Sequence, residues 1–142
     1  ASVREPVAGP GAQINAMGRD RAGRLWMGGP AGLWRREDAR WEEIPRPSAV
    51  GERWINGIAP KGGGVVVAFQ RAGVQRWDGT RWHPVELPGV AASAEAAAAA
   101  GADDTVWLGL KDNVLWRWRG FLRMAQGLSQ HAIRRISPVV AG

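Results

Sequence analysis

Short apolar runs separated by turn residues recur along the chain, with the spacing of strands rather than of helices. The segment Asp20–Trp34, D-R-A-G-R-L-W-M-G-G-P-A-G-L-W, shows the unit: a turn, an apolar strand, a second turn and the next strand. Nearly continuous apolar character, as in Arg24–Gly28, is typical of a strand packed on both faces. Alternation of polar and apolar residues, as in Arg40–Ile44 (R-W-E-E-I), is typical of a half-exposed edge strand. The pattern predicts four strands: Ile14–Arg19, Arg24–Gly28, Leu33–Arg36 and Arg40–Ile44.

The same unit returns about 41 residues later, which makes this a repeat protein. This shift places Ile14 on Ile55, Gly32 on Gly73, Trp41 on Trp82 and Trp26 on Val67. A third copy follows at 40 or 41 residues, where Trp107 follows Val67. The second copy predicts a turn at Lys61–Gly64, a hairpin turn at Asp78–Gly79, and strands over Ile55–Pro60, Val65–Phe69, Gly73–Trp77 and Arg81–Val85.

The third copy contains an alanine-rich stretch that local propensity and repeat register interpret differently. Ala91–Ala100 is helical by propensity alone. Counting back from Trp107 instead places an inner strand at Glu95–Ala100, where small side chains suit a crowded channel. We favour the strand and keep a short helix as the alternative. The remaining strands are predicted at Thr105–Gly109, Asn113–Trp118 and Phe121–Met124.

A period near 40 to 45 residues, made of short strands, is the signature of β-propeller blades with four antiparallel strands each. The sequence therefore predicts an all-β fold, with residues 1–142 forming one propeller segment. Its blades span approximately 13–45, 54–86 and 94–125, and partial strands lie at 1–8 and 128–140. Within the second of these, Ile133–Ser137 resembles the inner strand of a further blade. Closed propellers typically have four to eight blades, so either a longer chain or identical chains would supply the rest.

Composition removes several function classes. The absence of cysteine excludes disulfides and thiolate metal sites. The net charge is +6, but the arginines are dispersed rather than clustered, which favours ordinary strand surface over a nucleic-acid interface. No apolar run approaches the 18 residues or so of a membrane span, so we expect no membrane insertion of this segment.

The first copy resembles the two-component regulator propeller repeat. The shared elements are an isoleucine-led strand, an Asp-x-x-Gly turn, an L-W-x-G strand and a G-L-x-R strand, at Ile14, Asp20, Gly23, Leu25, Trp26, Gly28, Gly32, Leu33 and Arg35. The tail Gly127–Ile136 is similar to the family's lead-in to a new blade. The second copy departs from the pattern at Lys61 and Val67, and the third has Asp103-Asp104 in place of Asp-x-x-Gly.

The resemblance implies a role in signal transduction. In that family such propellers form the extracytoplasmic sensor part of bacterial histidine kinases or diguanylate cyclases, usually as about seven blades. It therefore implies a periplasmic or extracellular sensor that binds a ligand or a partner domain, with the output domain elsewhere.

Nothing in the sequence points to catalysis, a metal or a cofactor. His83 and His131 lie far apart in the repeat register, whereas a metal site needs at least three converging ligands. Asp20, Asp103 and Asp104 fall at strand turns, where a carboxylate normally bonds its own backbone. We accordingly expect a non-catalytic protein.

The loops left free by the repeat carry the candidate site. Most tryptophans sit within strands and are expected between blades, but Trp54 directly precedes an inner strand. Propeller ligands usually meet the face formed by fourth-to-first and second-to-third strand loops. Those loops hold Arg53, Trp54, Asn56, Gln70, Arg71, Lys111, Asp112 and His131. This mixture suits a glycan or an anionic small molecule.

The sequence is also consistent with two functions other than a sensor. Asp104–Arg117 resembles the repeat of tectonin-like sugar-binding propellers, which implies a carbohydrate-binding module. The other alternative is a structural repeat that oligomerises.

Overall fold

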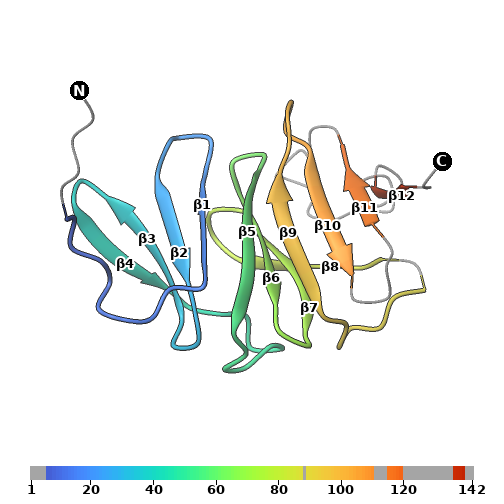
Figure 1. Cartoon of the computed structure of the whole chain (residues 1–142), viewed down its shortest axis with the longest axis horizontal. Coiled ribbons are helices and arrows are strands. Elements are labelled where there is room, and N and C mark those ends of the chain that lie inside the picture. Colours follow the sequence, from blue (N-terminus) through green and yellow to red (C-terminus); the bar gives the residue numbers. More distant parts are fainter. Residues whose placement is uncertain (1–5, 88, 111–114, 120–135, 140–142) are drawn as a thin grey trace.

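The protein is built from three four-stranded antiparallel sheets that follow one another along the chain. This is seen in a computed structural model, which describes residues 6–87, 89–110, 115–119 and 136–139. Figure 1 shows the sheets side by side, from the N-terminal to the C-terminal end of an arc. Within the described residues there is no helix, and therefore none that could cross a membrane. The predicted all-β architecture of propeller blades is confirmed.

The first sheet has the strand order β1-β2-β3-β4, so each strand pairs with the next in sequence. Its turn between β1 and β2 is held by the Asp20 carboxylate, which accepts hydrogen bonds from the Arg24 backbone N–H at 2.9 Å and the Trp26 indole N–H at 3.0 Å. Gly23 follows with φ of 84°, which favours glycine. The Asp-x-x-Gly segment is therefore a turn, as predicted. The strands are β1 (Ala16–Arg19), β2 (Leu25–Gly28), β3 (Leu33–Glu37) and β4 (Arg40–Ile44).

The second sheet lies between the other two and has the order β5-β6-β7-β8. Every residue of β6 is buried, because its sheet is packed on both faces. Lys61, predicted in a turn, instead ends β5 and is fully buried. The strands are β5 (Ile55–Lys61), β6 (Gly64–Phe69), β7 (Gly73–Trp77) and β8 (Trp82–Val85).

The alanine-rich stretch forms an inner strand rather than a helix. β9 (Ala96–Ala100) pairs with β10 (Val106–Leu110) and packs against β5. A Cβ added at Gly57 of β5 would lie only 2.6 Å from the Ala98 nitrogen, so the two backbones leave no room for larger side chains. Tertiary packing overrides the helix propensity of alanine at this position.

The fourth strand of the third sheet differs from the prediction. β11 (Leu115–Trp118) pairs antiparallel with β12 (Ile136–Val139), whereas the sequence indicated that Ile133–Ser137 would begin another blade. This pairing supplies hydrogen-bond partners to the outer edge of β11, a role that sequence periodicity alone does not assign. The predicted strand at Phe121–Met124 and the N-terminal strand around Val3 lie outside the described residues.

Cross-strand pairing also corrects the repeat register. Trp26 pairs with Gly18 and Arg35 in the first sheet. We call such a set of residues, paired across neighbouring strands, a row. The corresponding row in the second sheet is Ala59, Val66 and Arg76, so Trp26 corresponds to Val66 and not to Val67. The turn after the inner strand is one residue shorter there, which shifts β6 relative to the uniform count. In the third sheet the row is Ala99, Trp107 and Arg117.

Each pair of neighbouring sheets encloses its own core. Trp26, Leu33, Ile55 and Phe69 are among the buried residues between the first two sheets. The second core, between the second and third sheets, contains Ala68, Leu108 and Trp118. Close approach at the inner strands depends on glycine, since a Cβ at Gly18 would lie 2.7 Å from the Ile58 carbonyl oxygen.

A buried charge pair crosses the second of these interfaces. The Lys61 ammonium donates to the Asp104 carbonyl oxygen and lies 3.4 Å from its carboxylate. The Gly62 N–H donates to the same carboxylate at 2.9 Å. Both Asp103 and Asp104 have positive φ, consistent with their predicted place in a turn. The charge pair therefore joins the strand-end turns of adjacent sheets.

Candidate functional site

A groove of about 820 Å³ opens where the connection between β4 and β5 runs beside the outer strands of the second sheet. We call it the arginine groove. Four arginines line it, together with two tryptophans and a buried glutamine. Its lining residues are Pro45, Arg46, Pro47, Ser48, Ala49, Val50, Arg53, Arg71, Ala72, Gln75, Trp77, Thr80, Arg81, Trp82, Pro84, Ala92 and Ser93.

The connection that forms one wall is fixed by hydrogen bonds. The Arg46 guanidinium donates to the carbonyl oxygens of Pro30 at 3.2 Å, Ala31 at 3.3 Å and Arg53 at 3.1 Å. These bonds tie the connection to the turn between β2 and β3. Val50 is buried in the core between the first two sheets, which anchors the middle of the connection. The wall is thus built before any ligand arrives, as in most binding sites.

A second wall of the groove, which adjoins the connection, is aromatic. Trp77 and Trp82 pair across β7 and β8, with ring centroids 5.2 Å apart, and Phe69 meets the edge of Trp82 at 5.9 Å. The Trp82 indole N–H donates to the Pro45 carbonyl oxygen at 2.6 Å, which fixes that ring against the connection. The Trp77 indole nitrogen is buried and has no hydrogen-bond partner among the described residues. Gln75 adds a buried amide to this wall.

Three exposed arginines form the rim: Arg53, Arg71 and Arg81. Within the described part of the chain, no carboxylate lies within ion-pair distance of any of them. Guanidinium groups offer planar, paired donors that match carboxylate, sulfate and phosphate groups. The groove therefore combines an apolar wall with a rim suited to an anion.

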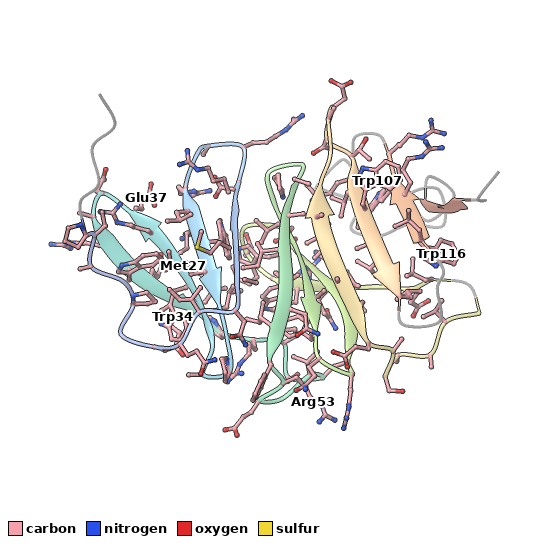
Figure 2. The ribbon with its side chains drawn as sticks, in the orientation of Figure 1. Met27, Trp34, Glu37, Arg53, Trp107 and Trp116 are labelled. Carbon is pink, nitrogen blue, oxygen red and sulfur yellow. The ribbon has the colours of Figure 1, made fainter. Side chains whose placement is uncertain are left out.

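The structure gathers four of the predicted site residues at one edge of the arc. Arg53 and Arg71 line the groove, and Figure 2 shows Arg53 at the lower edge of the arc. Trp54 adjoins them with 46% of its surface exposed. Its carbonyl oxygen accepts the Gln70 backbone N–H at 2.7 Å, which joins the two loops.

The other predicted residues do not join this cluster. The Asn56 amide donates to the Glu95 carboxylate at 2.7 Å and to the Ala96 carbonyl oxygen at 3.4 Å, so it bridges β5 and the start of β9. Lys111, Asp112 and His131 lie outside the described residues.

Sequence reasoning missed the aromatic wall. The sequence pattern predicts a structural role for both tryptophans, because Trp77 sits within a strand and Trp82 recurs with Trp41 at matching outer-strand positions. A signal was nevertheless present, since the hairpin turn predicted at Asp78–Gly79 places these two side chains opposite each other. Arg81 and Gln75 gave no such signal.

One histidine–carboxylate pair lies near the groove. His83 Nε2 is 2.6 Å from Asp78 Oδ2, and the Asp78 Oδ1 atom accepts the backbone N–H groups of Thr80 and Arg81. Burial raises the pKa of Asp78, but hydrogen bonds from His83, Arg81 and Thr80 outweigh burial and lower the pKa to about 2. Among the described residues, no group of three or more histidine, aspartate or glutamate side chains could hold a metal ion.

Comparison with known proteins supports the fold and leaves the family unassigned. No protein-family model matches the chain, and no curated protein matches it. Among solved structures, it is similar to a catalytically inactive H270A virginiamycin B lyase from Staphylococcus aureus, solved with quinupristin. The TM-score is 0.54 at 17% identity, over 86% of this chain. The chain spans 39% of the length of that lyase, a seven-bladed β-propeller-type protein.

This similarity corrects the expectation that the protein is not an enzyme. The solved neighbour is a lyase, so a fold of this kind does carry catalysis, and the blade pattern is no ground for excluding it. Repeat periodicity identifies architecture, whereas chemistry depends on individual side chains grafted onto it. At 17% identity the likeness itself shows the propeller fold alone.

Proposed function

We propose that this β-propeller module binds a small anionic molecule with an apolar body in the arginine groove, and that it is the sensing part of a larger bacterial receptor outside the inner membrane. The observation that carries the proposal is the convergence of Arg53, Arg71 and Arg81 on the rim of a groove walled by Trp77 and Trp82. The sensor role rests on the resemblance of Ile14–Arg36 to the two-component regulator repeat.

The chemistry of the groove selects the ligand class. The paired indole rings offer apolar area to a flat or aliphatic body. The three rim arginines then compensate a carboxylate, sulfonate or phosphate at the end of that body. Because the rim is solvent-exposed, the ionic contribution is modest and is screened by salt.

A carbohydrate ligand is the second candidate, and the exposed Trp54 is what favours it. An indole face with 46% of its surface exposed, beside Arg53, is suited to stacking on a sugar ring. A glycan held in this way would depend on Trp54 more than on the groove tryptophans.

Isothermal titration calorimetry with 1-naphthalenesulfonate tests the proposal, using 1-naphthalenemethanol as the neutral counterpart. We expect the sulfonate to bind with a dissociation constant of about 10–100 µM, and the alcohol to bind about tenfold more weakly. Arg53→Ala and Arg71→Ala should each weaken sulfonate binding about fivefold, because each removes one charge-assisted contact at the rim.

Arg40→Ala is the matched control, because Arg40 is an exposed arginine on β4 outside the groove. It should leave the dissociation constant unchanged. The proposal would be contradicted if the sulfonate and the alcohol bound with equal affinity. It would also be contradicted if Arg53→Ala, Arg71→Ala and Arg40→Ala all weakened sulfonate binding equally. Binding that survives both rim substitutions but is abolished by Trp54→Ala would favour the carbohydrate-type site.

A further inference from the structure

The two ends of the arc expose faces that correspond to the two sides of an interface already present inside it. Between the first and second sheets, one side carries Trp26 and Leu33, with Arg35 stacked over Trp26 at 5.6 Å. The third sheet repeats this arrangement on its outer face. There Arg117 stacks over Trp107 at 5.7 Å, in the same cross-strand row.

Burial distinguishes the two copies of this face. Leu33 is completely buried, whereas Leu115 at the same place in the third sheet is 39% exposed. Trp26 has 1% of its surface exposed, and Trp107 is only partly buried. The outer face of the third sheet is therefore arranged like an interface, but among the described residues it is less buried than its counterpart in the first sheet.

A glycine in this face leaves a space, which we call a socket, for a side chain of the neighbouring sheet. At Gly28 a Cβ would lie 2.7 Å from the Ile55 side chain, so Ile55 of the second sheet fills the space that glycine leaves. Gly109 holds the corresponding place in the third sheet, two residues after Trp107. Among the described residues no atom lies within 4 Å of a Cβ built there. In the described part of the chain, the space above Gly109 is therefore unfilled, and it is of the kind that accepts a branched aliphatic side chain.

The first sheet presents the complementary residues at the other end of the arc. Ile55 and Ile58 of the second sheet meet Gly28 and Gly18 of the first. The residues 41 positions earlier are Ile14 and Met17, which are 37% and 60% exposed. Met17 pairs with Met27 on β2, opposite in direction to its buried neighbour Ala16.

Figure 2 shows Met27 and Trp34 on the sheet at one end of the arc and Trp107 on the sheet at the other. We propose that copies of this chain associate head to tail, with the Met17–Met27 face of one copy packed on the Trp107–Leu115 face of the next. The packing repeats the interface between the first and second sheets.

Charge supports the same orientation. Glu43 pairs with Trp34 on β3 and lies exposed on the Met27 side of the first sheet. In the repeat it corresponds to Pro84 of the second sheet, 41 residues later, which pairs with Gln75. The proposed contact would bring the face that carries the Glu43 carboxylate towards the face that carries the Arg117 guanidinium, so the two faces have opposite charges. Because the two surfaces differ, the contact is heterologous, and association proceeds by adding copies in one direction or closing a ring.

Light scattering after size-exclusion chromatography tests this with two variants that each disable one face. Gly109→Val fills the socket, and Met17→Asp places a charge on the opposing face. We expect the wild type to exceed the mass of a single chain, with the excess increasing with concentration. Each variant alone should be monomeric, whereas an equimolar mixture should give a one-to-one dimer, because each variant retains the face that the other lacks.

Ala22→Asp is the control, since it adds the same charge at an exposed turn residue outside the strands that form the two faces. It should assemble like the wild type. Near-ultraviolet circular dichroism checks that every variant is folded, and Met17 is exposed enough for its substitution to leave the fold intact. A wild type that stays monomeric at millimolar concentration would overturn the proposal, as would a mixture of the two variants that forms no dimer.

Discussion

At the scale of single residues, the motif of the first copy has a structural role. The Trp26 indole lies in the core and donates its N–H to Asp20, so the two most recognisable residues of the motif form one structural unit. Burial raises the pKa of Asp20, but hydrogen bonds from Trp26 and Arg24 outweigh it and lower the pKa. A structural role for both residues could be predicted from their positions in the repeat, and the hydrogen bond supports it.

At the same scale, Asp78→Asn should destabilise the protein. The pKa of Asp78 is about 2 in the folded state, below its ordinary value of 3.8, so its stabilisation is complete above pH 4 and is lost as the pH falls towards 2. We expect a decrease of about 1–2 kcal/mol in the free energy of unfolding at pH 7.

Urea unfolding of the wild type and the Asp78→Asn variant at pH 7 and pH 2 measures this difference. The difference should be much smaller at pH 2, where about half of the wild-type carboxylate is protonated in the folded state. A difference that is the same at both pH values would show that the loss comes from packing rather than from the ionised carboxylate.

Among the elements, strand positions and the pairing of consecutive strands were predictable, whereas the exact register and the partner of β11 were not. The bounds of β3, β4 and β7 agree with the sequence pattern to within a residue, because alternation and turn residues are local signals. A uniform shift of 41 residues aligns Trp26 with Val67, whereas strand pairing aligns it with Val66. The uniform shift is wrong here because the turn is one residue shorter in the second copy, and a shift of one residue moves a side chain to the other face of the sheet. The place of β12 beside β11 depends on a long-range pairing that no local signal encodes.

The close contact of inner strands gives an element-scale prediction. Gly57→Ala should destabilise the protein by about 1–3 kcal/mol, because the new methyl group would lie 2.6 Å from the Ala98 backbone nitrogen, which cannot move aside easily. Thermal unfolding followed by circular dichroism measures the change.

Gly109→Ala is the matched control for this strand glycine, since no described atom lies within 4 Å of its Cβ position. Its unfolding temperature, measured at low protein concentration, should stay close to that of the wild type. If both substitutions lower the unfolding temperature by the same amount, the effect would come from replacing any strand glycine. Close packing of β5 on β9 would then not be its cause.

For the molecule as a whole, the arc and its groove arise from how successive sheets are joined. The connection between β4 and β5 lines the groove beside the outer strands of the second sheet, which places Arg53 near Trp77 and Trp82. Sequence reasoning placed Arg53, Trp54, Gln70 and Arg71 on one loop edge, because the order of strands in a blade fixes which loops share a face. It could not place the tryptophan wall there, because that depends on the path of the connection in three dimensions.

The indole N–H resonances of the nine tryptophans give the most direct test of the arginine groove as the binding site. Titration of ¹⁵N-labelled protein with 1-naphthalenesulfonate should shift the Trp77 and Trp82 signals in a saturable manner and leave those of Trp26 and Trp107 unchanged. Saturable shifts confined to Trp107, or to tryptophans outside the groove, would contradict the account.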